Sequence, residues 1–183
     1  MSRALRADAQ RNYDAVVEAA REAFELHGTG ASLDDIAAQA GVGNATLYRH
    51  FPTRDSLIVE TLRFRFAELD AVARELGGHP DPAVALREWF VELAANLGLW
   101  RGLADAVAQS PADSPLRIAC APLQLRTQML LLKAQDGGMA RLDLTPHEVF
   151  ALITALAWAA ERFGDTEVEL ERRVDLVLSG VLG

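Results

Sequence analysis

Hydrophobic positions recur every three to four residues along most of the chain, and this spacing predicts helices almost throughout. Few segments alternate apolar and polar residues as a half-buried strand does, so the pattern predicts an all-α fold. The predicted helices span residues 8–27, 32–39, 43–50, 53–77, 81–98, 100–109, 115–136, 146–163 and 167–181. The helix over 53–77 has no predicted break, and we expect it to link a small N-terminal bundle to a larger C-terminal one.

The most informative segment covers residues 32–54. A short helix over 32–39, a tight turn over 40–43 and a second short helix over 44–51 follow one another here. Gly41 suits a turn that needs a positive φ, and Val42 is placed to fill the hollow between the two helices. Two short helices joined by a glycine-containing turn are typical of a helix-turn-helix, whose second helix enters the major groove of DNA.

Helical geometry separates the faces of the second short helix. Leu47 and Phe51 lie four residues apart and are expected to pack inward, which leaves a small residue, an amide, a hydroxyl, a phenol and a guanidinium on the outer side. The residues predicted to contact DNA are Ser32, Gly43, Asn44, Ala45, Thr46, Tyr48, Arg49, His50, Thr53 and Arg54. The alternatives are an ordinary solvated helical hairpin, a core role for Tyr48 and a local capping role for His50.

The string DDIAAQAGVGNATLYRHFPTRDSL, residues 34–57, resembles the TetR/AcrR family of bacterial regulators. The resemblance implies a three-helix DNA-binding domain, which we place at 1–54, and a helical ligand-binding and dimerisation domain at 55–183. It also implies that the last two helices form a homodimer and that a bound ligand releases the operator. The chain has Gly43 where a serine is common and Ala45 where a glycine is common, so no operator sequence is carried over.

Composition adds limits rather than a mechanism. The net charge of -8 is unusual for a DNA-binding protein, but residues 1–54 hold six arginines against seven carboxylates, so most of the negative charge lies in the remainder. The chain holds one cysteine, Cys120, which cannot form an internal disulfide, and it has neither an N-terminal leader nor an apolar run long enough to span a bilayer. These features predict a cytoplasmic protein with no membrane association.

The C-terminal half is expected to hold the site for an unidentified small-molecule effector, an expectation that depends mainly on the family resemblance. The candidate ligand-binding residues are Trp89, Trp100, Gln124, Gln128, Met129 and Trp158. For any single aromatic residue, core packing is the favoured alternative. A ligand between the helix at 53–77 and the helices at 81–136 is predicted to tilt the former and so to move the recognition helix away from its groove.

Wide apolar stripes on the last two helices are predicted to form a two-fold homodimer interface. The candidate interface residues are Val149, Ile153, Leu156, Ala160, Val174, Val177 and Leu178. The alternative is a monomer that folds these stripes into its own core.

An enzyme is not expected. The four histidines are scattered without metal-ligand spacing, and no phosphate-binding loop, dinucleotide fingerprint or nucleophile elbow is present, so neither a metal nor a cofactor is predicted. Cys120 stands in an apolar stretch and is interpreted as an inert small side chain. The sequence therefore predicts a ligand-responsive repressor that binds palindromic operator DNA as a homodimer. The alternatives are a helical protein-interaction module and an activator of the same fold.

Overall fold

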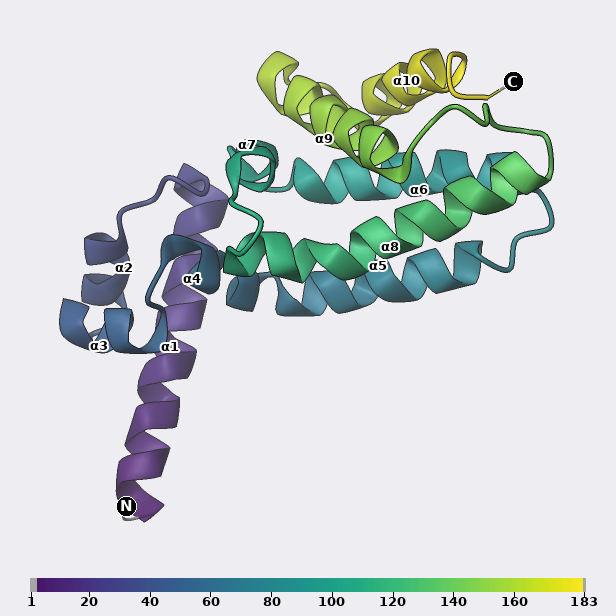
Figure 1. Ribbon diagram of the computed structural model, residues 1–183. Helices are drawn as coiled ribbons and strands as arrows, with labels where there is room; N and C mark the ends of the chain where they lie inside the picture. The colour runs from purple at the N-terminus through teal and green to yellow at the C-terminus, as the bar shows by residue number, and fades with distance from the viewer. Residues whose placement is uncertain (1–2, 183) are drawn as a thin grey trace.

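The computed structural model describes residues 3–182, and side chains from residue 7 onward. Its elements are all helices, arranged as a small N-terminal group and a longer C-terminal bundle (Figure 1). They are α1 (Arg3–His27), α2 (Leu33–Gln39), α3 (Asn44–His50), α4 (Arg54–Thr61), α5 (Arg63–Leu76), α6 (Pro82–Leu97), α7 (Leu103–Gln109), α8 (Pro115–Asp136), α9 (Pro146–Phe163) and α10 (Glu167–Leu178). This confirms the predicted all-α class with a helix-turn-helix near the N-terminus.

The helix predicted over 53–77 is wrong in one respect, because the chain bends at Leu62 and forms α4 and α5 instead of one helix. Leu62 has a φ of -94° and a ψ of 0°. The hydroxyl of the preceding Thr61 donates to the carbonyls of Ile58 (2.7 Å) and Leu57 (3.1 Å). Side-chain bonds of this kind compete with the backbone ladder and bend helices. Burial of the Leu62 side chain fixes the bend against the core.

The N-terminal group is held together by a compact apolar core. Phe24 of α1, Ile36 of α2 and Leu47 of α3 are fully or almost fully buried. Phe51, immediately after α3, is also buried, and its ring lies 5.0 Å from that of Tyr13. The inward positions predicted for Leu47 and Phe51 agree with this packing, and the outer side of α3 is left to solvent.

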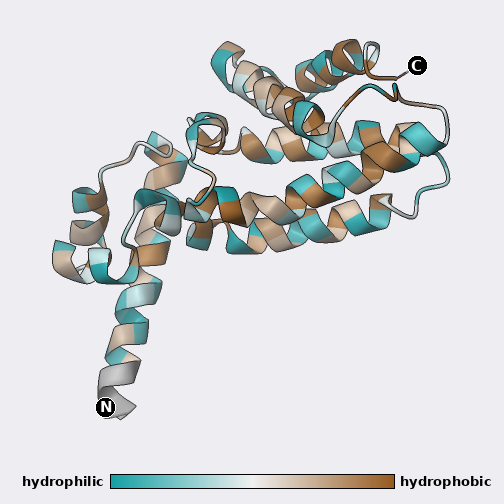
Figure 2. Cartoon of the chain, in the orientation of Figure 1, coloured by the Kyte–Doolittle hydropathy of each residue, from teal (hydrophilic) through white to brown (hydrophobic). Residues whose placement is uncertain are grey.

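The C-terminal bundle is built around α6, which packs against α5, α8, α9 and α10. Figure 2 shows hydrophobic residues along α6 and along the sides of its neighbours that meet it. Trp89 lies at the centre, fully buried, and its indole N–H donates to the hydroxyl of Thr127 at 2.8 Å. At the surface, the Arg87 guanidinium bonds Asp175 of α10 at 2.6 Å and holds the pKa of that carboxyl below its usual range.

The N-terminal group and the bundle meet at a small set of polar contacts, called here the interdomain joint and made by residues 28–31, Arg54 and residues 101–102. The Thr29 N–H donates to the carbonyl of Arg101 at 2.9 Å. Arg54 donates to the carbonyls of Thr29 (2.8 Å) and Ala31 (2.5 Å). Gly28 has a φ of +74°, and a Cβ added there would lie 2.4 Å from the Arg101 carbonyl oxygen. Only glycine therefore fits this loop against the bundle.

Among residues 3–182, no helix is both long enough and apolar enough to span a bilayer.

Candidate nucleic-acid interface and ligand cavity

The turn between α2 and α3 has the geometry that the sequence predicts. Gly41 adopts a φ of +67°, and the Val42 N–H donates to the Ala37 carbonyl at 3.0 Å. Val42 is partly buried against the core. Ser32 caps α2 by accepting the Asp35 N–H at 3.2 Å. These local bonds fix the angle at which α3 leaves the domain.

The outer side of α3 presents its polar side chains together. Asn44, Tyr48 and Arg49 are exposed, with 46% of Tyr48 accessible, and Thr46 is half-buried at their edge. Asn44 also donates one amide N–H to the Asp34 carboxylate at 2.7 Å, which ties the start of α3 to α2. Its carbonyl oxygen and second N–H are not used in this bond. The face therefore offers donors and acceptors of the kind that read base edges.

The residues predicted at the margins of this face are arranged around it. Gly43 and Ala45 are exposed and add little bulk. Ser32 and Thr53 are exposed at the starts of α2 and α4, and Thr53 forms a reciprocal capping box with Ser56. Helix starts with exposed backbone N–H groups suit phosphate contacts.

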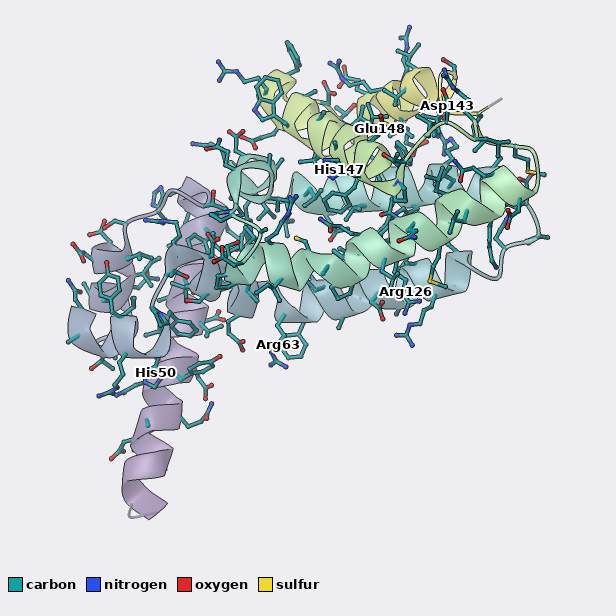
Figure 3. The ribbon with its side chains drawn as sticks, in the orientation of Figure 1. His50, Arg63, Arg126, Asp143, His147 and Glu148 are labelled. Atoms are coloured by element: carbon teal, nitrogen blue, oxygen red, sulfur yellow. The ribbon has the colours of Figure 1, made fainter. Side chains whose placement is uncertain are left out.

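His50 lies apart from the exposed face. Figure 3 shows it beside α1, and its ring meets that of Tyr13 edge-on at 5.8 Å. Its Nε2 atom is buried and has no hydrogen-bond partner among the described residues. Burial, together with a hydrogen bond to the Glu60 carboxylate, raises the pKa of Tyr13 to about 12. His50 therefore packs between α3 and α1. The sequence had predicted that it contacts a DNA phosphate.

Arg54 also has a role that the sequence did not reveal. Its guanidinium is half-buried and bonds the two carbonyls of the interdomain joint. The acceptors lie 23 and 25 residues earlier in the chain, so no local pattern could have identified them. The predicted contact of Arg54 with a DNA phosphate therefore competes with its bonds to these two carbonyls.

Arg11 of α1 is exposed and pairs with Asp8.

The structure corrects the residues chosen for a dimer interface. Five of them are buried within the single chain: Val149, Ile153, Leu156, Val174 and Leu178. The other two, Ala160 and Val177, are partly buried against the same core. These positions face α6, because α9 and α10 both pack on that helix. The large apolar side chains that are exposed on α9 and α10 are instead Trp158, Phe163, Val168 and Leu176.

An apolar cleft of the bundle lies between α7, α8 and α9, smaller than the hollow of about 510 Å³ between α6, α9 and α10. It has a volume of about 420 Å³ and is lined by Ala104, Asp105, Val107, Ala108, Arg117, His147, Phe150, Ala151, Thr154, Ala155 and Trp158. We call it the α7–α9 cleft. A second hollow of about 280 Å³ adjoins it, shares His147 and Phe150, and extends along α8 past Gln124 and Gln128. Both volumes are of the order that small-molecule sites require.

The space where the sequence predicts the ligand is nearly filled. The hollow lined by α5, α6, α7 and α8 has a volume of about 10 Å³, far below that of a small-molecule site. Trp89 and Trp100 are buried in packed interior, the latter against Phe24 at 5.3 Å, and Met129 is exposed on α8 outside both hollows. Three of the predicted ligand residues remain beside open space: Trp158 in the α7–α9 cleft, and Gln124 and Gln128 in the adjoining hollow. Cys120 is buried, which raises its pKa to about 11 and keeps the thiol unreactive at neutral pH.

Comparisons with known proteins agree with this arrangement. Residues 16–61 match a family model described as bacterial regulatory proteins of the tetR family, and residues 81–182 match the SbtR-like C-terminal domain of transcriptional regulators. No curated protein matches the chain significantly.

Solved structures extend the similarity over almost the whole chain. A TetR transcriptional regulator of Streptomyces coelicolor is 34% identical over 92% of this chain and 97% of its own, with a TM-score of 0.60. A TetR regulatory protein of Mycobacterium vanbaalenii is 30% identical over 98% and 99%, with a TM-score of 0.54. The regulator FadR of Bacillus subtilis, solved with stearoyl-CoA, shares the fold at 17% identity, over 91% and 96% of the two chains, with a TM-score of 0.64.

Proposed function

The chain belongs to the TetR family of bacterial transcriptional regulators, and on that premise we propose that it is a repressor that binds a palindromic operator as a homodimer and is released by a small molecule. The observation that carries the DNA-binding part is the exposed side of α3, where Asn44, Tyr48 and Arg49 stand together on a helix fixed from behind by Leu47 and Phe51. We retain residues 1–54 and 55–183 as the proposed domains, with the boundary at the first residue of α4.

We assign roles within this surface by position. Asn44, Thr46, Tyr48 and Arg49 enter the major groove, where amide and guanidinium groups read base edges and Ala45 leaves room for a thymine methyl group. Backbone phosphates are contacted by the chain around Ser32, Gly43 and Thr53. His50 and Arg54 act behind this surface: the first packs against Tyr13, and the second holds the interdomain joint.

The homodimer interface is proposed on the outer faces of α9 and α10. Phe163, Val168 and Leu176 of these two helices have exposed fractions of 69%, 76% and 66%, so an interface here would remove three large apolar side chains from water. Two copies that bury these residues against each other form a two-fold four-helix contact. Such a dimer presents two α3 helices, which must lie about 34–36 Å apart, or a multiple of this, to read successive turns of one DNA face.

Replacing Leu176 or Val168 with aspartate is expected to convert the dimer to a monomer, because each change places a charge in an apolar contact. Sedimentation equilibrium measures the mass directly. The control is Phe64→Asp, since Phe64 is 70% exposed on α5, on the other side of the bundle from α9 and α10 (Figure 1). Dimers that persist in both α10 variants would place the interface elsewhere.

The switch is proposed to pass through α7. Ala104 and Ala108 of this helix line the α7–α9 cleft, so a ligand there touches α7 directly. The N-terminal end of α7 is held by the Gly102 N–H, which donates to the Glu161 carboxylate of α9 at 2.8 Å, and the preceding Arg101 carbonyl accepts the Thr29 N–H of the joint. At the other end, the Ser110 hydroxyl bonds Asp55 of α4 at 3.2 Å. Movement of α7 thus reaches the DNA-binding domain through Thr29, and it reaches the first turn of α4, which follows that domain, through Asp55. The complex of FadR with stearoyl-CoA supports a ligand role for this fold.

The test is selection of bound duplexes from a fragmented bacterial genome by the intact protein. We expect the parent to recover an inverted repeat and Tyr48→Ala/Arg49→Ala to bind it about a hundredfold more weakly, because each lost contact to a base or phosphate costs on the order of 1–3 kcal/mol. Arg65→Ala, on the exposed side of α5, is the control and should bind as the parent does.

Two outcomes would overturn the proposal. A folded parent dimer that selects no duplex at low salt would favour a protein-interaction module. An operator placed across a reporter promoter should lower expression, and a rise in expression would identify an activator.

A further inference from the structure

We propose that the α7–α9 cleft binds a planar aromatic monocarboxylate, with the carboxylate on Arg117 and the ring between Trp158, Phe150 and the alanines of α7 and α9. The inference depends on the proposed function only in naming this ligand as the effector. The binding site itself is argued from the side chains that line the cleft.

Arg117 supplies the anion-binding group. It is half-buried, and its side chain makes one hydrogen bond within the described residues, to the Val107 carbonyl at a long 3.4 Å. No carboxylate lies within ion-pair distance of it in that part of the chain, whereas Arg87 and Arg126 of the same bundle bond carboxylates at 2.6 and 2.7 Å. A partly buried guanidinium with free donors binds a carboxylate through two parallel hydrogen bonds.

The backbone adds positive potential at the same place. Arg117 lies in the first turn of α8, a helix of 22 residues whose first turn holds no acidic residue. The N-terminal end of a helix carries a partial positive charge, so α8 and the Arg117 side chain favour the same ligand charge. Gln124 and Gln128 follow at intervals of two and three turns on α8 and continue the polar edge into the adjoining hollow.

The remaining wall selects a flat apolar group. Trp158 is 45% exposed over the cleft and Phe150 forms part of its floor, and rings of this kind stack on aromatic ligands. Ala104, Ala108, Ala151 and Ala155 line the same space, and their single methyl groups leave a shallow slot between α7 and α9. A volume of about 420 Å³ accepts one or two fused rings more readily than a large ligand.

The charges along the cleft set the orientation of the ligand. The bond from Gly102 to Glu161 places the N-terminal end of α7 beside the C-terminal half of α9, which puts Asp105 near Trp158. His147 lies at the other end of α9, as Figure 3 shows, 11 residues from Trp158 and therefore about 16 Å along the helix. The carboxylate thus binds toward Arg117 and His147, and the exposed Asp105 repels a second negative charge at the far end.

The test compares 2-naphthoate with 2-naphthamide, which has the same shape and no charge. Binding to the protein alone is followed by fluorescence, with Trp158→Phe identifying the signal of the exposed indole. We expect saturable binding of the carboxylate, at least about tenfold tighter than that of the amide, because a charge-assisted hydrogen-bonded pair replaces a neutral one. Rising salt should weaken the binding of 2-naphthoate and leave the binding of 2-naphthamide unchanged. Equal binding of the two compounds, or no saturable binding, would overturn the proposal.

Three variants locate the preference. Arg117→Gln should reduce the preference for 2-naphthoate over 2-naphthamide to about twofold or less. Asp105→Asn should tighten the binding of 2-naphthoate. Arg141 lies in an exposed loop and pairs with Asp143, so Arg141→Gln should change neither the preference nor the affinity. A preference that survives Arg117→Gln in a folded protein would remove Arg117 from the site. Thermal melts establish that each variant is folded, and the salt dependence of the parent decides the question if Arg117→Gln is not.

Operator release is measured separately, by anisotropy of a labelled operator. If 2-naphthoate does not bind, the proposed ligand class is wrong and the proposed DNA-binding function is unaffected. Binding of 2-naphthoate without release would overturn the proposed switch and its effector, while the binding site would stand.

Discussion

Phe51→Ala is expected to lower the free energy of unfolding by about 3–5 kcal/mol, the loss typical of a large aromatic side chain removed from a packed core. Phe51 is 3% exposed and follows α3 directly, so its ring anchors the recognition helix to α1 through Tyr13. The domain is small, and few neighbouring side chains can move into the cavity. Urea unfolding at a fixed protein concentration measures the change, because dimerisation makes apparent stability depend on concentration.

The matched control is Tyr48→Ala, an aromatic residue three positions earlier that is 46% exposed, against 3% for Phe51. Its effect on unfolding should stay within about 0.5 kcal/mol. Phe51→Ala should therefore lose stability, whereas Tyr48→Ala should lose DNA binding. A Phe51→Ala protein as stable as its parent would contradict the assignment of faces to α3.

Gly28→Ala is expected to cost about 1–2 kcal/mol for the left-handed backbone and a further 1–3 kcal/mol for the collision with Arg101. The added Cβ would lie 2.4 Å from the Arg101 carbonyl oxygen and 2.8 Å from its Cβ, so the joint must open. Because the same loop provides the acceptors of Arg54, we expect operator affinity to fall along with stability. Unfolding and operator titration on one preparation measure both.

Gly138→Ala separates the two contributions. Gly138 has a φ of +69°, close to that of Gly28, and an added Cβ there meets nothing within 4 Å. It should show the backbone cost alone and leave operator binding unchanged. Equal losses in the two variants would mean that the loop tolerates the collision and that the joint is not a tight contact.

The DNA-binding half was the more predictable part of the molecule because its signals are local. Gly41, Val42 and the spacing of Leu47 and Phe51 lie within eleven residues, and the packing between α2 and α3 follows from them. The exceptions are His50 and Arg54, whose neighbours come from α1 and from the loop after it. A side chain that is satisfied by distant segments gives no sign of this in its own surroundings.

The bundle was less predictable because a helical stripe shows which residues share a face and not what covers that face. Val149, Ile153 and Val174 form such stripes, and α6 covers them inside one chain. Trp89 and Trp158 are equally plausible ligand contacts by residue type, yet one is sealed in the core and the other borders open space. The bend at Leu62 is not marked by a glycine or a proline in the sequence. A threonine such as Thr61 occurs in many unbent helices, so its hydroxyl alone does not predict a bend.

The interdomain joint also determines how this protein could be recombined with its relatives. A hybrid regulator that takes its first 50 or so residues from another chain keeps Arg54 and Arg101 from the host and receives their partners, residues 28–31, from the donor. A donor residue larger than glycine at position 28 would then meet the host's Arg101 carbonyl. We expect a hybrid to fold when residues 28–31 come from the same parent as Arg54 and Arg101, which contact them. This condition holds however well the recognition helix fits its operator.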